Sequence, residues 1–126
     1  MTKKEFALAQ IVPYYKDPSS CARNENGNCE YLSANGKMCV VGKNLLDANK
    51  FKDCDILVKE ILAENTQEKV FKPESCNILN VKEWSHLQDL HDYIACMKTS
   101  MEEEIEYTCN ELGLFTYEEL IEESKK

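Results

Sequence analysis

Apolar residues at helical spacing dominate the C-terminal half of the chain. They follow one another three or four positions apart: Leu87, Leu90, Ile94, Met97, Met101 and Ile105. Because an α-helix has 3.6 residues per turn, this row predicts one long amphipathic helix that starts near residue 80. Asn80 and Glu83 predict a capping box at its start, and Gly113 suits its C-terminal cap. Thr116 and Glu119 predict a second capping box, which opens a last helix.

The N-terminal half predicts shorter helices. The first is expected over residues 2–15, with Pro13 ending it, because proline lacks an amide donor and disfavours helix in the residue before it. Asp53 can cap another helix over residues 54–63. Residues 64–79 show no helical pattern.

The clearest local signal is the dipeptide Asn35-Gly36, which lies between two β-prone runs at 29–33 and 38–41. Asparagine and glycine tolerate the positive φ angles of a type I′ turn, so the pattern predicts a β-hairpin with a two-residue loop. In that register Leu32 faces Cys39. An isolated hairpin is barely stable, so one face must pack on helices.

A chain of 126 residues has the usual size of one domain. We therefore predict a single domain over residues 1–126. Its expected fold is α+β and mainly helical, with four or five helices and one β-hairpin at about residues 29–41.

The charge balance excludes some partners. The formal net charge is −8, and Arg23 is the only arginine. Because arginine is the usual reader of phosphates and bases, direct binding of nucleic acid is not expected. No apolar run is long enough to span a membrane, and none of signal-peptide length follows the first lysines, so we expect a cytoplasmic protein. The oligomeric state is left open, a homo-oligomer included.

The cysteine pattern does not predict a metal site. None of the seven cysteines forms a C-x₂-C pair, and His86 and His91 lie five apart, on different faces of a helix. We interpret the cysteines as reduced thiols. The glycines form neither a P-loop nor a dinucleotide-binding pattern. No metal and no cofactor is therefore predicted.

One catalytic constellation can be drawn from the sequence. Cys39, His91 and Asp92 could meet in space as a thiol-dependent hydrolase, but the apolar neighbours of Cys39 suit a buried thiol better. Trp84, Tyr93 and Tyr107 stand at helical spacing, and we interpret them as core residues rather than as the lining of a pocket.

Two short patterns carry a resemblance. They are Gly27-x-Cys29-x-Tyr31 followed by Gly36-x-x-Cys39-x-Val41-Gly42, and Leu87-Gln88-x-x-His91-Asp92. Over about residues 5–95, the chain resembles small uncharacterised proteins of bacteriophages, prophages and bacteria. The resemblance implies a phage or mobile-element origin, hence the host cytoplasm. It also implies that the hairpin packs against the His91 helix, with His91 and Asp92 tying the two together or facing a shared pocket.

These observations favour a non-catalytic accessory protein, not an enzyme, that antagonises a host defence system as an inhibitor. Its expected partner is a host protein with a basic surface, bound through acids such as Glu102, Glu103, Glu104 and Glu106. One alternative is a protein that sequesters a small nucleotide-like signal, with Tyr31, Arg23, Lys43, Trp84 and His91 as contacts. The other is the hydrolase that uses Cys39, His91 and Asp92.

Overall fold

The computed structural model describes residues 1–21, 30–51, 57–63, 66–95 and 101–126. In these ranges it contains six α-helices: α1 (Lys3–Lys16), α2 (Val58–Ala63), α3 (Gln67–Val70), α4 (Val81–Ala95), α5 (Glu102–Leu112) and α6 (Tyr117–Ser124). Three short 3-10 helices accompany them, at Pro18–Ser20, Gly42–Asn44 and Ala48–Phe51. None of the described helices has the length and apolar character to cross a membrane.

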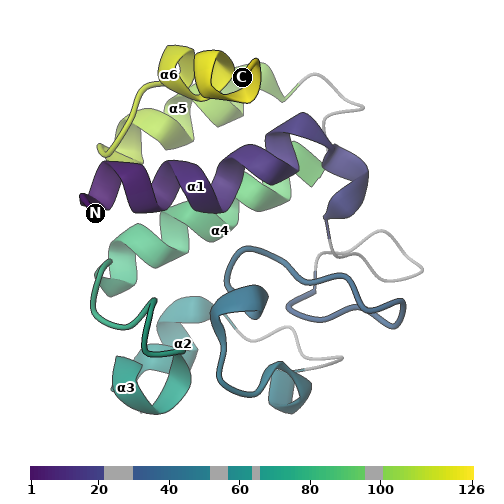
Figure 1. Cartoon of the computed structure of the whole chain (residues 1–126), viewed down its shortest axis with the longest axis vertical. Helices are drawn as coiled ribbons and strands as arrows, with labels where there is room; N and C mark the ends of the chain where they lie inside the picture. The colour runs from purple at the N-terminus through teal and green to yellow at the C-terminus, as the bar shows by residue number, and fades with distance from the viewer. Residues whose placement is uncertain (22–29, 52–56, 64–65, 96–100) are drawn as a thin grey trace.

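Helix α4 lies at the centre of the fold. It packs against α1, α2 and α5, and α6 covers α1 and α5 (Figure 1). The chain reverses between α4 and α5, so the two helices run in opposite directions. Trp84, Leu87, Leu90, His91 and Ile94 of α4 are all 0% exposed. The helices α1, α4, α5 and α6 therefore form one layered body. Helix α2 and the segment 30–51 lie against the other side of α4, and α3 packs beside α2.

The predicted β-hairpin is wrong. The described residues 30–51 contain no β-strand, only an isolated antiparallel bridge between Leu32 and Met38 and another from Leu45 to Phe71. The Ser33 amide donates to the carbonyl of Lys37 at 2.8 Å, and the Gly36 amide donates to the carbonyl of Ser33 at 3.0 Å. The loop thus holds three residues, and the register is shifted by one from the expected pairing.

Two local causes explain this difference. The predicted type I′ turn needs positive φ at both Asn35 and Gly36, but only Gly36 adopts it, at +84°. After Cys39 the chain coils instead of extending, because the amide of Lys43 donates to the Cys39 carbonyl at 3.1 Å. Gly42 permits this coiling, since any Cβ there would overlap the carbonyl oxygen of Tyr31. Of the first run of the predicted hairpin, at 29–33, only Cys29 lies outside the described residues.

We call residues 39–44 the coiled segment. Asn44 attaches it to α1 and to Lys72. The Asn44 side-chain amide donates to the Val40 carbonyl at 2.7 Å and to the Gln10 side chain of α1 at 2.8 Å. The Asn44 carbonyl accepts the amide of Lys72 at 2.9 Å. These bonds satisfy buried polar groups that a strand ladder would otherwise have satisfied.

Helix α1 continues through Pro13, contrary to the prediction that it ends there. Pro13 and Ala9 are both exposed, so the carbonyl that proline leaves without a donor faces water. The Asp17 amide closes the last turn by donating to the Pro13 carbonyl at 3.1 Å. The helix starts with a capping box between Thr2 and Glu5.

The predicted long helix is divided into α4 and α5. A straight helix over residues 81–112 would be about 48 Å long and would leave much of its apolar row uncovered. The reversal lets Ile105 of α5 reach the core, where it is 0% exposed. The predicted caps are confirmed: Asn80 and Glu83 exchange hydrogen bonds at 2.8 and 2.9 Å, and Gly113 ends α5 at φ +73°.

The remaining helices agree in part with the sequence. The capping box at Thr116 and Glu119 is present and opens α6. The described part of the 54–63 helix is α2, and Asp53 lies outside the described residues. Helix α3 forms within the stretch 64–79, where no helix was predicted. It has a single turn, which is too short for a 3.6-residue period to be visible.

Candidate functional site

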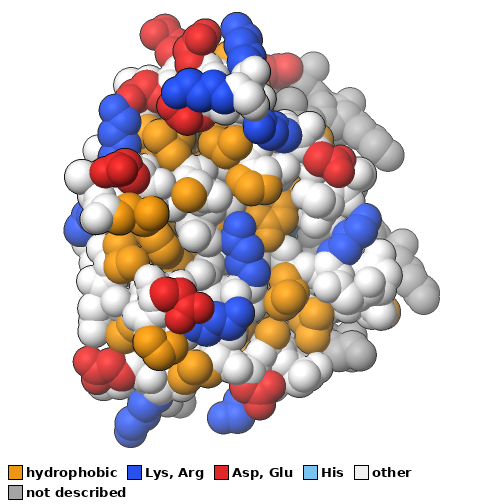
Figure 2. Space-filling view, in the orientation of Figure 1, with side chains coloured by type: hydrophobic (Ala, Val, Ile, Leu, Met, Phe, Trp, Pro, Cys, Tyr) orange, Lys and Arg blue, Asp and Glu red, His pale blue; other side chains and the backbone are white. Residues whose placement is uncertain are grey.

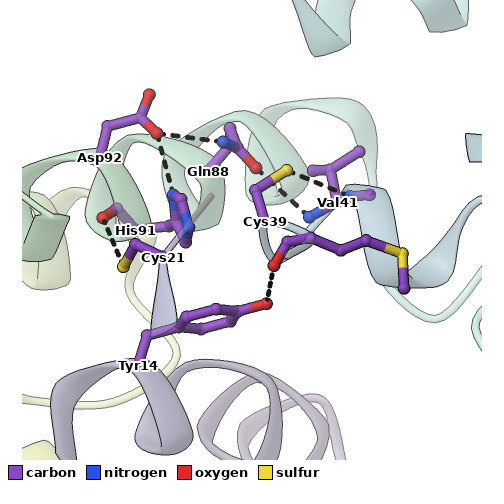
Figure 3. A network of polar contacts seen from close by, with 9 residues as sticks. Tyr14, Cys21, Cys39, Val41, Gln88, His91 and Asp92 are labelled. Carbon is purple, nitrogen blue, oxygen red and sulfur yellow. Dashed lines mark hydrogen bonds and ion pairs between the residues drawn. The ribbon is translucent and has the colours of Figure 1, made fainter. Parts of the chain in front are cut away.

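A network of polar contacts joins α4 to the coiled segment and to α1 (Figure 3). We call it the His91 network; its side chains are those of Tyr14, Cys21, Cys39, Gln88, His91 and Asp92. At its centre, the buried His91 ring places Nδ1 at 3.0 Å from Oδ1 of Asp92. The ring also meets Tyr14 edge to face, with centroids 4.8 Å apart. Asp92 keeps part of its carboxylate in solvent, with 40% of its side chain exposed.

Gln88 connects α4 to the coiled segment. Its Nε2 donates to Asp92 Oδ1 at 3.1 Å, and its Oε1 accepts the Val41 amide at 3.3 Å. Four residues separate Gln88 from Asp92, so both lie on one face of the helix. One side chain thus orients the carboxylate and also satisfies a buried backbone donor.

Cys39 lies inside this network and is 0% exposed. Its Sγ accepts the Gly42 amide at 3.2 Å. Burial raises the pKa of the thiol to about 12, and the nearby Asp92 carboxylate acts in the same direction. The thiol is therefore protonated at neutral pH and provides no nucleophilic thiolate.

Helix α1 and its following turn complete the network. The Tyr14 hydroxyl donates to the Met38 carbonyl at 2.6 Å, and Cys21 Sγ donates to the His91 carbonyl at 3.9 Å. Burial raises the pKa of Tyr14 above its ordinary value. The Lys43 ammonium lies 4.8 Å from the centroid of the Tyr14 ring.

The structure brings together the three residues of the hydrolase hypothesis, but it buries the thiol and the imidazole that would react. Cys39, His91 and Asp92 share one network, as the hydrolase hypothesis requires. The thiol and the imidazole are nevertheless both 0% exposed, and His91 Nε2 has no partner among the described residues. This arrangement suits a polar clamp that fixes the coiled segment to α4 better than it suits a reaction centre.

The residues proposed to hold a nucleotide do not converge. Trp84 is 0% exposed and stacks on Phe71 with centroids 4.6 Å apart. Tyr31 is buried, and Lys43 Nζ donates to the Gln10 carbonyl at 2.9 Å. Arg23 lies outside the described residues. None of the four described members of this set lines either of the hollows that follow.

The predicted acids lie on the surface, on α5. This helix carries five glutamates and no lysine or arginine. Glu102, Glu103, Glu104 and Glu106 are all exposed, and none has an ion-pair partner in the described part of the chain. Helix α6 differs, because three of its four acids pair with lysines: Glu119 with Lys4, Glu122 with Lys125 and Glu123 with Lys126. Figure 2 accordingly shows red and blue side chains mixed over α6.

A hollow of about 220 Å³ lies where α5 meets α4. Tyr93, Glu103, Glu104 and Tyr107 line it. Tyr107 is 64% exposed, so its interpretation as a core residue is wrong. Its hydroxyl bonds to Glu111, which raises the pKa of the phenol. Tyr107 follows four glutamates in the sequence and does not belong to the apolar row. This position could have revealed that its side chain is exposed.

A second hollow, of about 240 Å³, lies on the other flank of α5. Glu106, Asn110, Thr116, Tyr117 and Glu118 line it. The Tyr117 hydroxyl lies 2.9 Å from that of Tyr15, which anchors the ring between α6 and α1. Sequence reasoning did not single out Tyr117. The reversal of the chain at Gly113 brings it beside Glu106.

Comparisons of the chain with protein-family models, with curated proteins and with solved structures found no match.

Proposed function

We propose that this is a non-catalytic binding protein that acts through the exposed acidic surface of α5. The observation that carries the proposal is the charge of this helix, with five glutamates and no basic residue. None of the five forms an ion pair among the described residues, whereas three of the four acids of α6 pair with lysines. A surface of unpaired charge attracts a partner of opposite charge and accelerates their association.

The interior supports the same proposal. The groups that could perform chemistry, the Cys39 thiol and the His91 imidazole, are 0% exposed and serve to hold the coiled segment on α4. The thiol pKa of about 12 removes the nucleophile that a cysteine hydrolase needs.

The biological form of the proposal follows from the resemblance to phage and prophage proteins. The protein would act in the host cytoplasm as an inhibitor of a defence protein whose exposed surface is basic. Occupying that surface is sufficient for inhibition when the defence protein uses it to bind nucleic acid, which carries the same negative charge as α5.

A plating assay tests this function. The chain is expressed in bacterial strains that each carry one defence system, and the plating efficiency of a sensitive phage is measured. We expect efficiency to rise in at least one strain and to rise equally with Cys39→Ser, since no thiol chemistry is involved. Loss of the effect with Cys39→Ser in a variant that retains the helical circular-dichroism spectrum would favour the hydrolase. No rise in any strain would contradict the defence-antagonist form.

A further inference from the structure

We propose that the outward face of α5 docks a segment of a partner protein rich in arginine or lysine, with one basic side chain in each of its two flanking hollows. The inference rests on the proposed binding function and names the surface and the chemistry of the partner. On this face of α5, Glu103, Glu106, Tyr107 and Asn110 are exposed. These positions recur at helical spacing and form one continuous ridge between the hollows.

The hollow toward α4 has the composition that holds an organic cation. Tyr93 and Tyr107 supply aromatic rings, and Glu103 and Glu104 supply two carboxylates. A guanidinium or ammonium group is attracted both by a ring face and by a carboxylate. The 64% exposure of Tyr107 leaves its ring open to such a group.

The hollow toward α6, on the opposite flank, also combines an aromatic ring with two carboxylates. Tyr117 supplies the ring, and Glu106 and Glu118 supply the carboxylates. The volumes are similar, about 220 and 240 Å³. Because one helix forms a wall of both hollows, a partner that lies across α5 can fill both at once. Two linked contacts on one partner strengthen binding more than either does separately.

Other occupants fit less well. The described residues contain no group of acids and other ligands that could hold a metal ion. Nucleic acid would be repelled by a chain of net charge −8. A second copy of the chain would bring its own net charge of −8 toward this acidic helix, and like charges repel. A basic segment of a different protein is therefore the occupant that the charges favour.

The test uses an acetylated hexa-arginine peptide as the probe and isothermal titration calorimetry at physiological ionic strength. The variant Glu103→Gln/Glu104→Gln removes two carboxylates from one hollow. The control Glu60→Gln/Glu74→Gln removes two exposed carboxylates elsewhere and changes the net charge equally. We expect Kd to rise about fivefold in the first variant and less than twofold in the control, since exposed ion pairs each contribute modestly. Equal weakening in both would mean that the peptide responds only to net charge, and would overturn the proposal.

The variant Tyr107→Leu tests the aromatic part separately. It keeps an apolar side chain at an exposed position, so folding is not at stake, but it removes the ring. We expect Kd to rise about threefold for the same peptide, within the range of exposed cation–π contacts. An unchanged Kd would remove Tyr107 from the site. Sedimentation of the chain alone provides a further check, because dimers that Glu103→Gln/Glu104→Gln dissociates would identify a second copy as the occupant.

The two proposals can fail separately. If the chain raises phage plating but the peptide binds equally to both double variants, the proposed function stands and the docking surface on α5 does not. If the chain has no effect on plating but Glu103→Gln/Glu104→Gln weakens peptide binding as expected, the docking surface stands and the biological role does not.

Discussion

The His91 network and the outer face of α5 contain the same kinds of side chain under opposite conditions. Both regions contain tyrosine and carboxylate side chains: Tyr14 and Asp92 in the network, and Tyr107 with several glutamates on α5. In the network, His91 and Cys39 are 0% exposed and their contacts are made within the chain. On α5, Tyr107 is 64% exposed, and the acids around it have no ion-pair partners among the described residues. The difference teaches that residue type alone does not identify a site, because burial decides whether polar groups serve stability or recognition.

This comparison predicts that changes near the network cost stability, whereas changes on α5 do not. The largest effect is expected for Gly42→Ala. A Cβ at this position would overlap the Tyr31 backbone carbonyl, which cannot move like the end of a side chain. We expect the free energy of unfolding in urea to fall by about 3 kcal/mol, the upper part of the range for overpacking.

Gly36→Ala is the matched control for that change. Gly36 has φ +84°, but nothing lies within 4 Å of a Cβ there. Only backbone strain opposes the substitution, and its cost is about 1 kcal/mol. If Gly42→Ala destabilised the protein no more than Gly36→Ala, the close contact with Tyr31 would not exist in solution.

The second prediction concerns alkaline pH. The pKa of Cys39 rises from its ordinary value of 9.0 to about 12 in the folded protein. The folded state therefore holds this proton more tightly than the unfolded state, so stability is complete below about pH 9 and falls as pH rises toward 12. The slope for a single group reaches at most about 1.4 kcal/mol per pH unit.

Urea unfolding between pH 8 and pH 11 measures this slope. Cys39→Ala should reduce this slope by the contribution of one group, since the Cys39 thiol no longer titrates. The pKa of the Cys109 thiol is also raised to about 12, so Cys109→Ala should reduce the slope by a similar amount, and the double variant should lose both contributions. An unchanged slope in Cys39→Ala would show that this thiol is not held in its protonated form.

The sequence predicts those features of the fold that depend on neighbouring residues, and it fails where contacts between distant residues decide the structure. The capping boxes at Asn80 and Thr116 and the cap at Gly113 need only neighbouring residues, and all three were correctly placed. The coiled segment depends on distant partners. Gly42 meets Tyr31 and Val41 meets Gln88, so the local β-signal at Asn35-Gly36 was overridden by packing.

In the candidate site, too, residue types are predicted from the sequence, whereas burial and long-range contacts are not. The meeting of His91, Asp92 and Cys39 was anticipated from their residue types, but not the burial that limits their chemistry. The acids of α5 were singled out by their charge. The hollows beside them arise from the reversal before α5 and the turn at Gly113, which bring Tyr93 and Tyr117 to its two flanks. No periodicity in the chain encodes those contacts.

The smallest expected effect is on the stability of Glu103→Gln/Glu104→Gln. Two opposing contributions act on these residues. Both lie in the first turn of α5, where negative charge interacts favourably with the helix dipole. Both also repel the other glutamates of the helix, and neutralising them relieves that repulsion. We expect the free energy of unfolding to change by less than about 0.5 kcal/mol, as for surface positions in general.

Urea unfolding beside the control Glu60→Gln/Glu74→Gln measures this small change. Near-equal stability of the two variants would mean that α5 does not need its charge in order to fold, so that its acids remain available to a partner. A loss above about 1 kcal/mol confined to Glu103→Gln/Glu104→Gln would instead assign these carboxylates to the stability of the helix. The contrast between the buried network and the exposed face would then disappear, because both regions would use their polar groups for folding.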